Sequence, residues 1–360
     1  MSFSILKPDS PGWVGLFESL PLNQQDVFYS PFFAQLCKKT LNQEDEVLCA
    51  VMTSKAGVVL YPFVKRNLAR LTGFVNFSGY HDITGLYGRG GIVGSPAALM
   101  DIAPFHASMA AYCRENAIVC GFDRFHPVIA NDIYAAPDAK IMDIGGFVVV
   151  DMRPEMNVIE NAFKQSVRKD LRKAERNGIT CFAESNCDHL KEFLDIYYHT
   201  MGRNSAAEFY YFSEEYFAAV GKEIPGQFHF FYAVAGNDIV SCELVLHHGK
   251  YCHSFLGGTK REALPLCANP ILKREIISFL KDRGCEYFLL GGGSKPDDGI
   301  FSFKKAYAPE GVLPSRIGGM IWDHQTYGQL REEMLSAGVP VPANRFQFYD
   351  TNQTIVSNQA

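Results

Sequence analysis

The sequence has no long uninterrupted apolar run, no pair of closely spaced cysteines and no large excess of one charge. No apolar stretch approaches the ~18 residues that a membrane-spanning helix requires. The N-terminus lacks a basic region followed by an apolar segment, so no secretory signal is expected. The ten cysteines include no Cys-x-x-Cys pair and lie in apolar stretches, which is typical of a reducing compartment. We therefore expect a cytoplasmic protein.

The charge balance and the length narrow the class further. A formal net charge of −5 gives no general attraction to DNA or to an anionic membrane, so an anion site requires a local basic patch. Hydrophobic residues make up 47% of the chain and charged residues 20%, as in ordinary globular proteins. At 360 residues the chain is long for one hydrophobic core, which predicts two domains.

Several catalytic motifs are also missing. There is no Gly-x-Ser-x-Gly, no His-Glu-x-x-His, no phosphate-binding P-loop and no dinucleotide-binding Gly-x-Gly-x-x-Gly. His247 and His248 are adjacent, but a strand places such neighbours on opposite faces. We expect no metal site and no tightly bound cofactor. Serine hydrolases, zinc proteases, P-loop kinases and Rossmann oxidoreductases are disfavoured.

The most informative feature is an order of elements that occurs twice. Each half has two β-rich segments joined by a turn, then a Gly-rich segment, a helix and a further strand. In the first half these are 46–53, 58–65, 79–91, 97–115 and 118–125. In the second half they are 228–235, 239–247, 255–260, 270–283 and 285–290. This order predicts two α/β domains, residues 1–150 and 151–335, and a tail of residues 336–360. A single large mixed sheet is the alternative.

Helical and aromatic segments lie between the two repeats. Apolar residues recur every three or four positions over 155–177, which predicts one long amphipathic helix. A second helix is predicted over 188–202, and an aromatic-rich segment follows at 204–217.

The helix at 155–177 is also strongly basic. Five cations lie within residues 168–176, and Arg168 and Arg172 are four residues apart. Forked guanidinium groups match phosphate oxygens, so this face is a candidate phosphate-binding site. A solvated helix face is the alternative.

A second candidate follows the last predicted strand. Gly291, Gly292 and Gly293 would let backbone N–H groups approach an anion closely. Lys304, a little further on, could stabilise a developing oxyanion or a phosphate. A flexible connecting turn is the alternative.

A third candidate is the segment from Tyr80 to Gly91. Its aromatic residues, glycines, Asp82 and Arg89 suit the wall of a pocket for a sugar or nucleotide. Asp82 could act as a general base towards an amine if burial raises its pKa. An irregular connection with Asp82 as a turn cap is the alternative.

Together these segments resemble the Fem-type peptidyltransferases and the related acetyltransferases that share the GNAT fold. The resemblance rests on three stretches and their order over about 25–330: Ser166–Ile179 with Ala-Glu-x-x-Gly, Tyr198–Ser213, and Leu290–Lys304 with Phe-Lys. The Tyr80–Gly91 segment is similar to the Tyr/Asp/Gly stretch of the family's first half.

The resemblance implies tandem GNAT-like domains of the α/β (α+β) class, each with a central mixed sheet. It implies a bacterial acyltransferase that moves an acyl or aminoacyl group from acyl-CoA or aminoacyl-tRNA to an amine. The acceptor would be a small molecule or a cell-envelope or polysaccharide precursor. The implied catalytic residues are Lys304 and Asp82. The donor or phosphate would contact Arg168, Arg172, Arg203, Gly291, Gly292 and Gly293, and the acceptor would contact Tyr80, Tyr87, Arg89, Tyr211 and Phe303.

The sequence departs from the family in two places. The helical hairpin that some members use for tRNA is missing, and so is the usual GNAT pyrophosphate loop before the helix at 270–283. Neither donor is therefore fixed by the sequence. A non-catalytic binding module is the main alternative, and a metal-dependent glycosyl- or phosphotransferase using Asp297 and Asp298 is a third.

Overall fold

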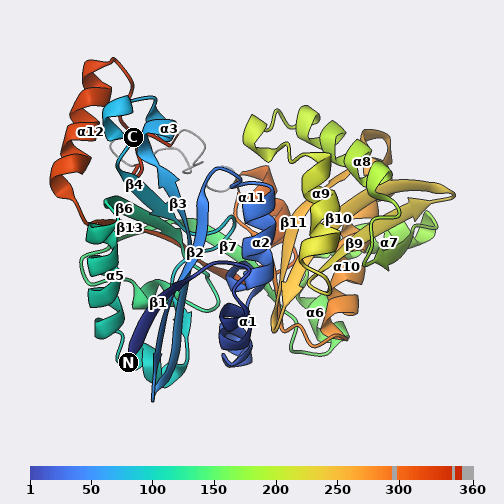
Figure 1. Ribbon diagram of the computed structural model, residues 1–360. Coiled ribbons are helices and arrows are strands. Elements are labelled where there is room, and N and C mark those ends of the chain that lie inside the picture. Colours follow the sequence, from blue (N-terminus) through green and yellow to red (C-terminus); the bar gives the residue numbers. More distant parts are fainter. Residues whose placement is uncertain (294–297, 343–344, 351–360) are drawn as a thin grey trace. The chain divides into compact units, whose positions relative to one another are not determined.

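The computed structural model describes residues 1–293, 298–342 and 345–350. The chain divides into two compact units (Figure 1). Unit 1 contains Met1–Gly145 and Pro314–Ala360, and unit 2 contains Gly146–Leu313.

Unit 1 is built mainly from the N-terminal part of the chain and ends with a C-terminal strand and helix. Its strands are β1 (Ser2–Leu6), β2 (Glu46–Ser54), β3 (Gly57–Asn67), β4 (His81–Thr84), β5 (Val93–Gly94), β6 (Ile118–Arg124) and most of β13 (Val312–Ile321). Its helices are α1 (Pro11–Glu18), α2 (Pro31–Lys39), α3 (Leu68–Thr72), α4 (Pro96–Met100), α5 (Ala103–Glu115) and α12 (His324–Ser336).

Unit 2 is one continuous stretch of chain. Its strands are the second half of β7 (Lys140–Asp151), β8 (Thr180–Glu184), β9 (Phe228–Ala235), β10 (Asp238–His248), β11 (Tyr251–Thr259) and β12 (Tyr287–Gly291). Its helices are α6 (Met156–Ala162), α7 (Gln165–Arg176), α8 (Leu190–Arg203), α9 (Glu214–Glu223), α10 (Ala268–Lys281) and α11 (Gly299–Lys305).

The sheets of the two units have the same order and the same strand directions. In unit 1 the order is β1-β2-β3-β4-β6-β13, and β5 adds to β3. In unit 2 it is β8-β9-β10-β11-β12-β7. In each sheet only the fourth and fifth strands pair in parallel, β4 with β6 and β11 with β12, and the other neighbours along this order are antiparallel. The duplicated mixed α/β fold predicted from the sequence is confirmed.

The last strand of each sheet does not follow directly in the chain after the strand beside it. After β6 the chain enters β7, whose residues Val148–Asp151 pair with β12 of unit 2. The corresponding strand of unit 1 is β13, where Ile317–Ile321 pair with β6. Residues 314–335 therefore belong with unit 1, whereas the sequence analysis placed them in the second domain.

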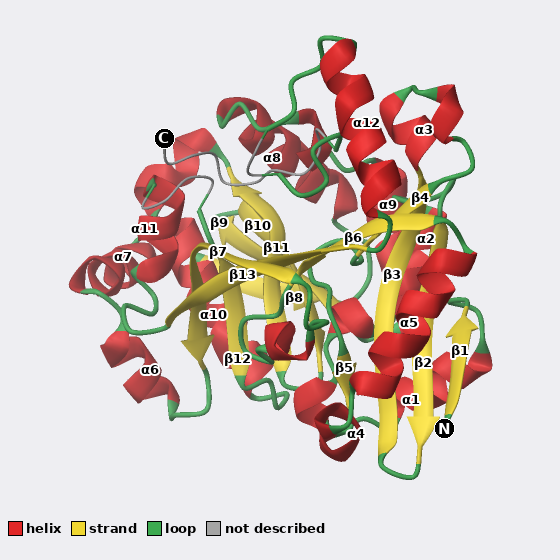
Figure 2. Cartoon of the chain, turned by 90° about the vertical axis from the view of Figure 1, so that its left-hand side faces the viewer, coloured by secondary structure: helices red, strands yellow, loops and turns green. Residues whose placement is uncertain are grey.

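Both predicted hairpins form, and each has a two-residue turn. In unit 1 Ser54 pairs with Gly57, and in unit 2 Ala235 pairs with Asp238. Gly236 has a φ of +61°, a conformation that suits glycine in a tight hairpin turn. In Figure 2, β1, β2 and β3 run side by side as one antiparallel sheet.

Helices pack on both faces of the sheet in unit 2 (Figure 1). On one face, Val167 and Leu171 of α7 share a core cluster with Leu272 and Ile276 of α10. On the other face, the Phe193 ring of α8 lies 4.9 Å from the ring of Phe230 on β9. The two faces of this sheet are therefore covered by different helices, which decides where the predicted cations lie.

Two predicted helices are each split in the structure. The segment 97–115 forms α4 and α5, because the chain leaves helical geometry at Asp101. The segment 155–177 forms α6 and α7, because Phe163 and Lys164 are extended.

The Gly-rich segment predicted at 255–260 is the end of a strand, β11. No helix among the described residues has the length and apolarity to cross a bilayer.

Candidate functional site

The parallel pair of strands in unit 2 separates along its length. Tyr251–His253 of β11 pair with Tyr287–Leu289 of β12, and among the described residues the pairing of these two strands ends there. β11 continues to Thr259 against β10, and β12 continues to Gly291 against β7. An opening between two strands of one sheet presents main-chain groups to an extended ligand, as a sheet edge does.

In unit 1 the equivalent pair stays together. The ladder between β4 and β6 runs from His81 to Thr84, which is the whole length of β4. The strand opening is thus a feature of unit 2 among the described residues, and it distinguishes two units that otherwise share their topology.

A β-bulge and two glycines shape β11 at the opening. The register between β10 and β11 shifts by one residue at Phe255. A Cβ at Gly257 would lie 2.4 Å from the carbonyl oxygen of Cys242, and one at Gly258 would lie 2.4 Å from Oγ1 of Thr200. A bulge bends its strand and re-aims the side chains. These glycines therefore serve close packing of β10 and α8 against β11.

Lys304 belongs to α11, and its side chain reaches the end of β12. Its Nζ donates a hydrogen bond to the carbonyl oxygen of Gly292 at 2.8 Å. Gly291 has a φ of +92°, and a Cβ there would lie 3.0 Å from this Nζ. The structure thus brings together Lys304 and the glycine segment ending at Gly293. Asp298 caps α11 by accepting from the Phe301 N–H, whereas Ser294–Asp297 lie outside the described residues.

A buried ion pair, which the sequence analysis did not identify, lies on β10 and α10. Nζ of Lys273 donates to Glu243 at 2.5 Å and to Oγ of Ser254 at 2.7 Å. Both charged residues are almost fully buried, with exposed fractions of 6% and 3%. Lys273 also lies 5.4 Å from the centre of the Phe288 ring on β12. The pair therefore links the helix to the strands that form the opening.

Tyr307 is a second buried polar residue that sequence reasoning missed. Its hydroxyl has no hydrogen-bond partner among the described residues, and its ring packs against Phe163 and Phe303. Burial, with the nearby Glu243 and Asp170 charges, raises the pKa of Tyr307 far above its ordinary value. The only sequence signal was its position just after the Phe-Lys pair.

The predicted donor-binding cations do not gather in one place. Arg168 donates to the carbonyl oxygens of Asn161 at 2.5 Å and Phe163 at 2.8 Å, so it closes the end of α6. Arg172 is exposed on α7. Arg203 belongs to α8, on the other face of the sheet, and donates to the Thr259 carbonyl oxygen at 2.9 Å. Only Arg203 touches a strand that borders the opening.

The two aromatic residues predicted to contact the acceptor in unit 2 are both accessible. Tyr211 is 41% exposed and its ring stacks on Tyr198 with centroids 6.3 Å apart. Phe303 is also 41% exposed and packs edge-on against Tyr307. Exposed aromatic rings of this kind are available for ligand contact, so both residues stay predictions.

In unit 1, Asp82 lies in a saturated network of hydrogen bonds. Its carboxylate accepts from Nε and Nη2 of Arg66 at 3.0 and 2.7 Å, from Gln347 at 2.8 Å and from Tyr349 at 2.8 Å. Arg66 also donates to Asp350 at 2.6 Å. Burial raises the pKa of Asp82, and the Arg66 guanidinium opposes that rise. Four donors fill the acceptor positions of a carboxylate, which favours a structural role over that of a base.

The other residues predicted from this segment are spread along it. Tyr80 packs at the edge of a cluster that includes Phe77 and Val119. Tyr87 and Arg89 are half-buried in the loop after β4. Burial and the neighbouring Arg124 lower the pKa of Arg89 to about 10. The segment therefore does not form one continuous wall.

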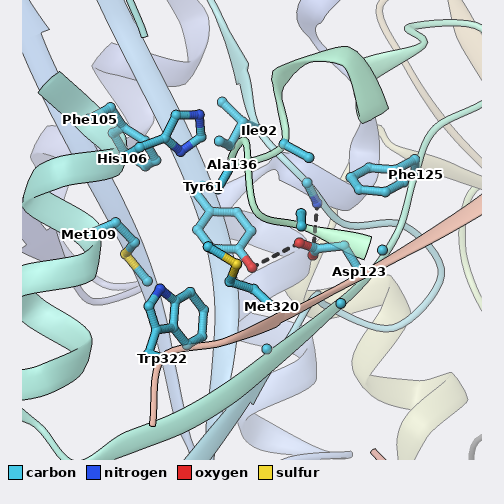
Figure 3. Close-up of a pocket in the computed structure, with 16 residues that line it drawn as sticks. Tyr61, Ile92, Phe105, His106, Met109, Asp123, Phe125, Ala136, Met320 and Trp322 are labelled. Atoms are coloured by element: carbon cyan, nitrogen blue, oxygen red, sulfur yellow. Dashed lines mark hydrogen bonds between the residues drawn. The ribbon is translucent and has the colours of Figure 1, made fainter. Parts of the chain in front are cut away.

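The segment does border a pocket that was not predicted (Figure 3). This unit 1 pocket has an empty volume of about 510 Å³, including its open mouth. Its lining comes from β3, α5, β6, β13 and the loops after β4, β6 and β13: Tyr61, Gly91, Ile92, Phe105, His106, Met109, Gly121, Asp123, Phe125, Ala135, Ala136, Ala139, Gly318, Gly319, Met320 and Trp322.

Asp123 is the carboxylate of the unit 1 pocket. It accepts a hydrogen bond from the Tyr61 hydroxyl at 2.9 Å and from the Gly91 N–H at 2.9 Å. A Cβ at Gly90 would lie 2.4 Å from its Oδ1, so the Gly-rich segment makes room for this side chain. Burial raises the pKa of Asp123 to about 6.

Comparison with known proteins places the fold. Residues 161–305 match the family described as acetyltransferase (GNAT) domain, and all of these residues belong to unit 2. No curated protein matches the chain. The match covers α7 to α11 and therefore includes the strand opening, the Glu243–Lys273 pair and Lys304.

Solved structures resemble the whole chain. FemX superposes with a TM-score of 0.71 at 12% identity, over 92% of this chain and 100% of FemX. The C-terminal domain of a protein named as a lysylphosphatidylglycerol synthetase, from Agrobacterium fabrum, gives 0.52 at 14% identity, over 88% of this chain and 93% of that domain. A conserved protein of unknown function from Bacteroides thetaiotaomicron gives 0.55 at 10% identity, over 88% and 99%.

The resemblance seen in the sequence is thus confirmed at the level of the fold. Residues 161–305 match the acetyltransferase (GNAT) domain family, and the chain as a whole has a fold similar to that of FemX. Identities this low carry the fold alone, so the function has to be argued from the site.

Proposed function

We propose that unit 2 is an acyltransferase that moves an acyl or aminoacyl group from an activated donor to an amine. The observation that supports this most strongly is the opening between β11 and β12, with the Lys304 ammonium of α11 beside the end of β12. It lies within the GNAT domain, and the equivalent strands of unit 1 remain paired along the whole of β4.

The donor we propose is an acyl-CoA thioester. An extended pantetheine arm can hydrogen-bond to main-chain groups between separated strands, as an added strand would. β11 leads through Lys260 and Arg261 to α10, a helix of 14 residues. A helix N-terminus next to cations favours phosphate groups. Aminoacyl-tRNA is the alternative donor, supported by the similarity in fold to a domain named as part of a lysylphosphatidylglycerol synthetase.

The proposed reaction is direct attack by a neutral amine. The amine nitrogen forms a bond to the donor carbonyl carbon, the carbonyl oxygen becomes an oxyanion, and the bond to sulfur then breaks. The amine loses its proton to water, and the thiolate leaves. The positive charge of the Lys304 ammonium, which donates to the Gly292 carbonyl oxygen beside the end of β12, stabilises the oxyanion.

The acceptor we propose is a cell-envelope or polysaccharide precursor that carries an amine. Tyr211 and Phe303, each 41% exposed, are available to stack on a sugar ring or an apolar group. Arg203 of α8, which donates to the carbonyl oxygen of the last residue of β11, would contact a carboxylate or phosphate of either substrate.

Replacing Lys304 with Met tests the proposal. We expect turnover to fall by about 10² to 10³-fold, as for the loss of one oxyanion donor, with an unchanged circular dichroism spectrum. The assay measures thiol release and amide product with a panel of acyl-CoA esters, and release of amino acid from charged tRNA.

Lys305→Met is the matched control, since it removes a cation from the same helical turn; Lys305 lies 6.0 Å from the Phe301 ring. Equal turnover in the wild type and the Lys304 variant would refute the role of Lys304. Ligand binding without any product across the whole panel would instead favour a non-catalytic binding module.

A further inference from the structure

The unit 1 pocket contains a charge that the proposed transfer in unit 2 does not use. Asp123 is the only residue with a formal charge among the described residues that line it, if His106 is neutral. Burial lowers the pKa of His106, which keeps its ring uncharged near neutral pH. The pocket is therefore a negatively charged site with otherwise uncharged walls.

Asp123 receives fewer hydrogen bonds than a carboxylate can accept. Its donors are the Tyr61 hydroxyl and the Gly91 N–H, one to each oxygen. A carboxylate has about four acceptor positions, and no Lys or Arg of the described chain is in ion-pair contact with it. Removing a carboxylate from water without a cationic partner costs stability, and such groups mark binding sites more often than the average surface.

The walls around Asp123 suit an apolar cation. Figure 3 shows Tyr61 and Trp322 on one side of the carboxylate and Phe125 on the other. Met320 lies beside Tyr61, and Met109 lies further out, near Trp322. Aromatic faces attract ammonium groups, and the methionines adapt to an apolar body.

Glycines in the strands leave room for the aromatic rings that line the pocket. A Cβ at Gly121 would lie 2.8 Å from the Trp322 ring, and one at Gly318 would lie 2.6 Å from the Phe125 ring. The rings that form the walls thus lie directly against the β6 and β13 backbones. The pocket is open to solvent, and its empty volume of about 510 Å³ includes that open mouth.

We propose that the unit 1 pocket binds a small organic cation, a primary ammonium group on an apolar body about as large as one aromatic ring. The ammonium donates to Asp123 between the aromatic walls, and the apolar body fills the space beside α5. This site is separate in sequence and in fold from the strand opening of unit 2, so it stands whether or not unit 2 proves to be a transferase.

Calorimetric titration of the full-length chain tests this with three matched probes at pH 7.5. They are 2-phenylethylamine, 2-phenylethanol and 3-phenylpropionate, which share a phenyl ring and differ in charge. We expect the amine to bind at least about tenfold more tightly than the alcohol, a difference of about 1.4 kcal/mol, and the anion to bind more weakly than both.

Asp123→Asn should remove this preference, so that amine and alcohol bind equally. Asp143→Asn is the matched control, because Asp143 is an exposed carboxylate of unit 1 outside the lining. Equal binding of amine and alcohol by the wild type, or an unchanged preference in the Asp123 variant, would overturn the proposal.

A second measurement on the wild type locates the probe if the Asp123 variant fails to fold. With methyl-labelled methionine, the amine should shift the Met109 and Met320 resonances saturably, while methionines outside the lining stay unchanged. Absence of such shifts at saturating amine would also overturn the proposal.

Discussion

At the scale of single residues, the least expected feature is the buried ion pair between Glu243 and Lys273. Two charges removed from water are tolerated only when they satisfy each other, and here Ser254 adds a third polar partner. Lys273→Met should destabilise unit 2 by about 3–5 kcal/mol, because it leaves the Glu243 charge buried alone. Chemical denaturation followed by hydrogen exchange of unit 2 peptides measures the loss.

The surface pair of Lys250 and Glu286, with side chains 32% and 31% exposed, provides the control. Lys250→Met should cost less than about 1 kcal/mol. The double variant Glu243→Leu/Lys273→Met should recover most of the lost stability. Similar losses of stability for Lys273→Met and Lys250→Met would show that the buried pair contributes no more to stability than the surface pair.

The raised pKa of the Asp123 carboxylate predicts that the stability of the folded chain depends on pH. Its pKa is about 6 in the folded chain and 3.8 in its ordinary state. The folded state therefore binds more protons between these values, so its stability falls as pH rises from about 4 to about 6. The Asp123→Asn variant has no such titration, so its free energy of unfolding should rise by about 1–3 kcal/mol relative to that of the wild type over this interval.

Tryptophan fluorescence during urea unfolding at pH 4, 5, 6 and 7 measures this difference. Both tryptophans of the chain, Trp13 and Trp322, belong to unit 1 and so report on the same unit as Asp123. The other titratable groups of the pocket, Tyr61 and His106, are common to both proteins. Parallel stability curves for the two proteins would contradict the prediction.

The residues differ in how far the sequence could identify them. Lys304 and the glycines were recognisable because they are neighbours of β12 within one short stretch. Asp123 and Tyr61 come from two separate strands and Trp322 directly follows a third, and only the sheet brings them together. Asp82 was recognisable as a polar residue in a special segment, but its partners Gln347 and Tyr349 lie more than 260 positions away.

At the scale of elements, the break between α6 and α7 shows what hydrophobic periodicity can and cannot predict. The stripe Ile159, Phe163, Val167 and Leu171 is buried in one cluster, as its spacing predicted. The helix nevertheless stops at Phe163, whose ring packs 5.4 Å from that of Tyr307. Periodicity reports the buried face, whereas continuity of the helix depends on a tertiary contact.

The same break separates the roles of two arginines that the sequence analysis treated alike. Arg168→Ala should cost about 1–2 kcal/mol, because the carbonyl oxygens of Asn161 and Phe163 lose a charged donor. Arg172→Ala, on an exposed face, should change stability by less than about 0.5 kcal/mol. Thermal and urea unfolding of the two variants measure these differences.

Donor kinetics of the same two variants test the phosphate-binding prediction. If Arg172 contacts the donor, its variant should raise the KM for acyl-CoA while leaving the melting temperature unchanged. Equal stability losses for the two variants would mean that Arg168 does not hold the end of α6.

The strands were the most predictable elements. The hairpins of β2 with β3 and of β9 with β10 follow from alternating β-rich segments around a tight turn. The glycines of β11 were misassigned to a loop, because glycine signals a turn in an isolated sequence. Here Gly257 and Gly258 are needed for close approach of β10 and α8, which only the packed structure reveals.

At the scale of the whole molecule, the two units are repeats whose final strands do not follow their chain order. β7 comes directly after unit 1 but pairs with β12, and β13 comes after unit 2 but pairs with β6. The sequence predicted the repeat from its element order. It could not predict this arrangement, since each of the two strands is compatible with either sheet by composition.

Unit 1 is therefore discontinuous, and its stability depends on residues at the end of the chain. A chain ending at Pro342 loses Gln347, Tyr349 and Asp350, which bind Asp82 and Arg66 in the interior. We expect the free energy of unfolding of unit 1 to fall by about 3–5 kcal/mol. The Arg66 charge stays buried but loses one of its two carboxylate partners. Hydrogen exchange of 1–145 peptides should accelerate, while exchange of 146–313 peptides should stay as in the full chain.

The point variant Asp350→Leu separates this charge effect from the loss of chain. It keeps the rest of the C-terminal segment and removes one carboxylate 2.6 Å from Arg66. Faster exchange confined to unit 1 in both proteins would place the effect in the Arg66 network. Uniform acceleration across both units would instead show that they unfold together, and would contradict the view of the chain as two separately stabilised repeats.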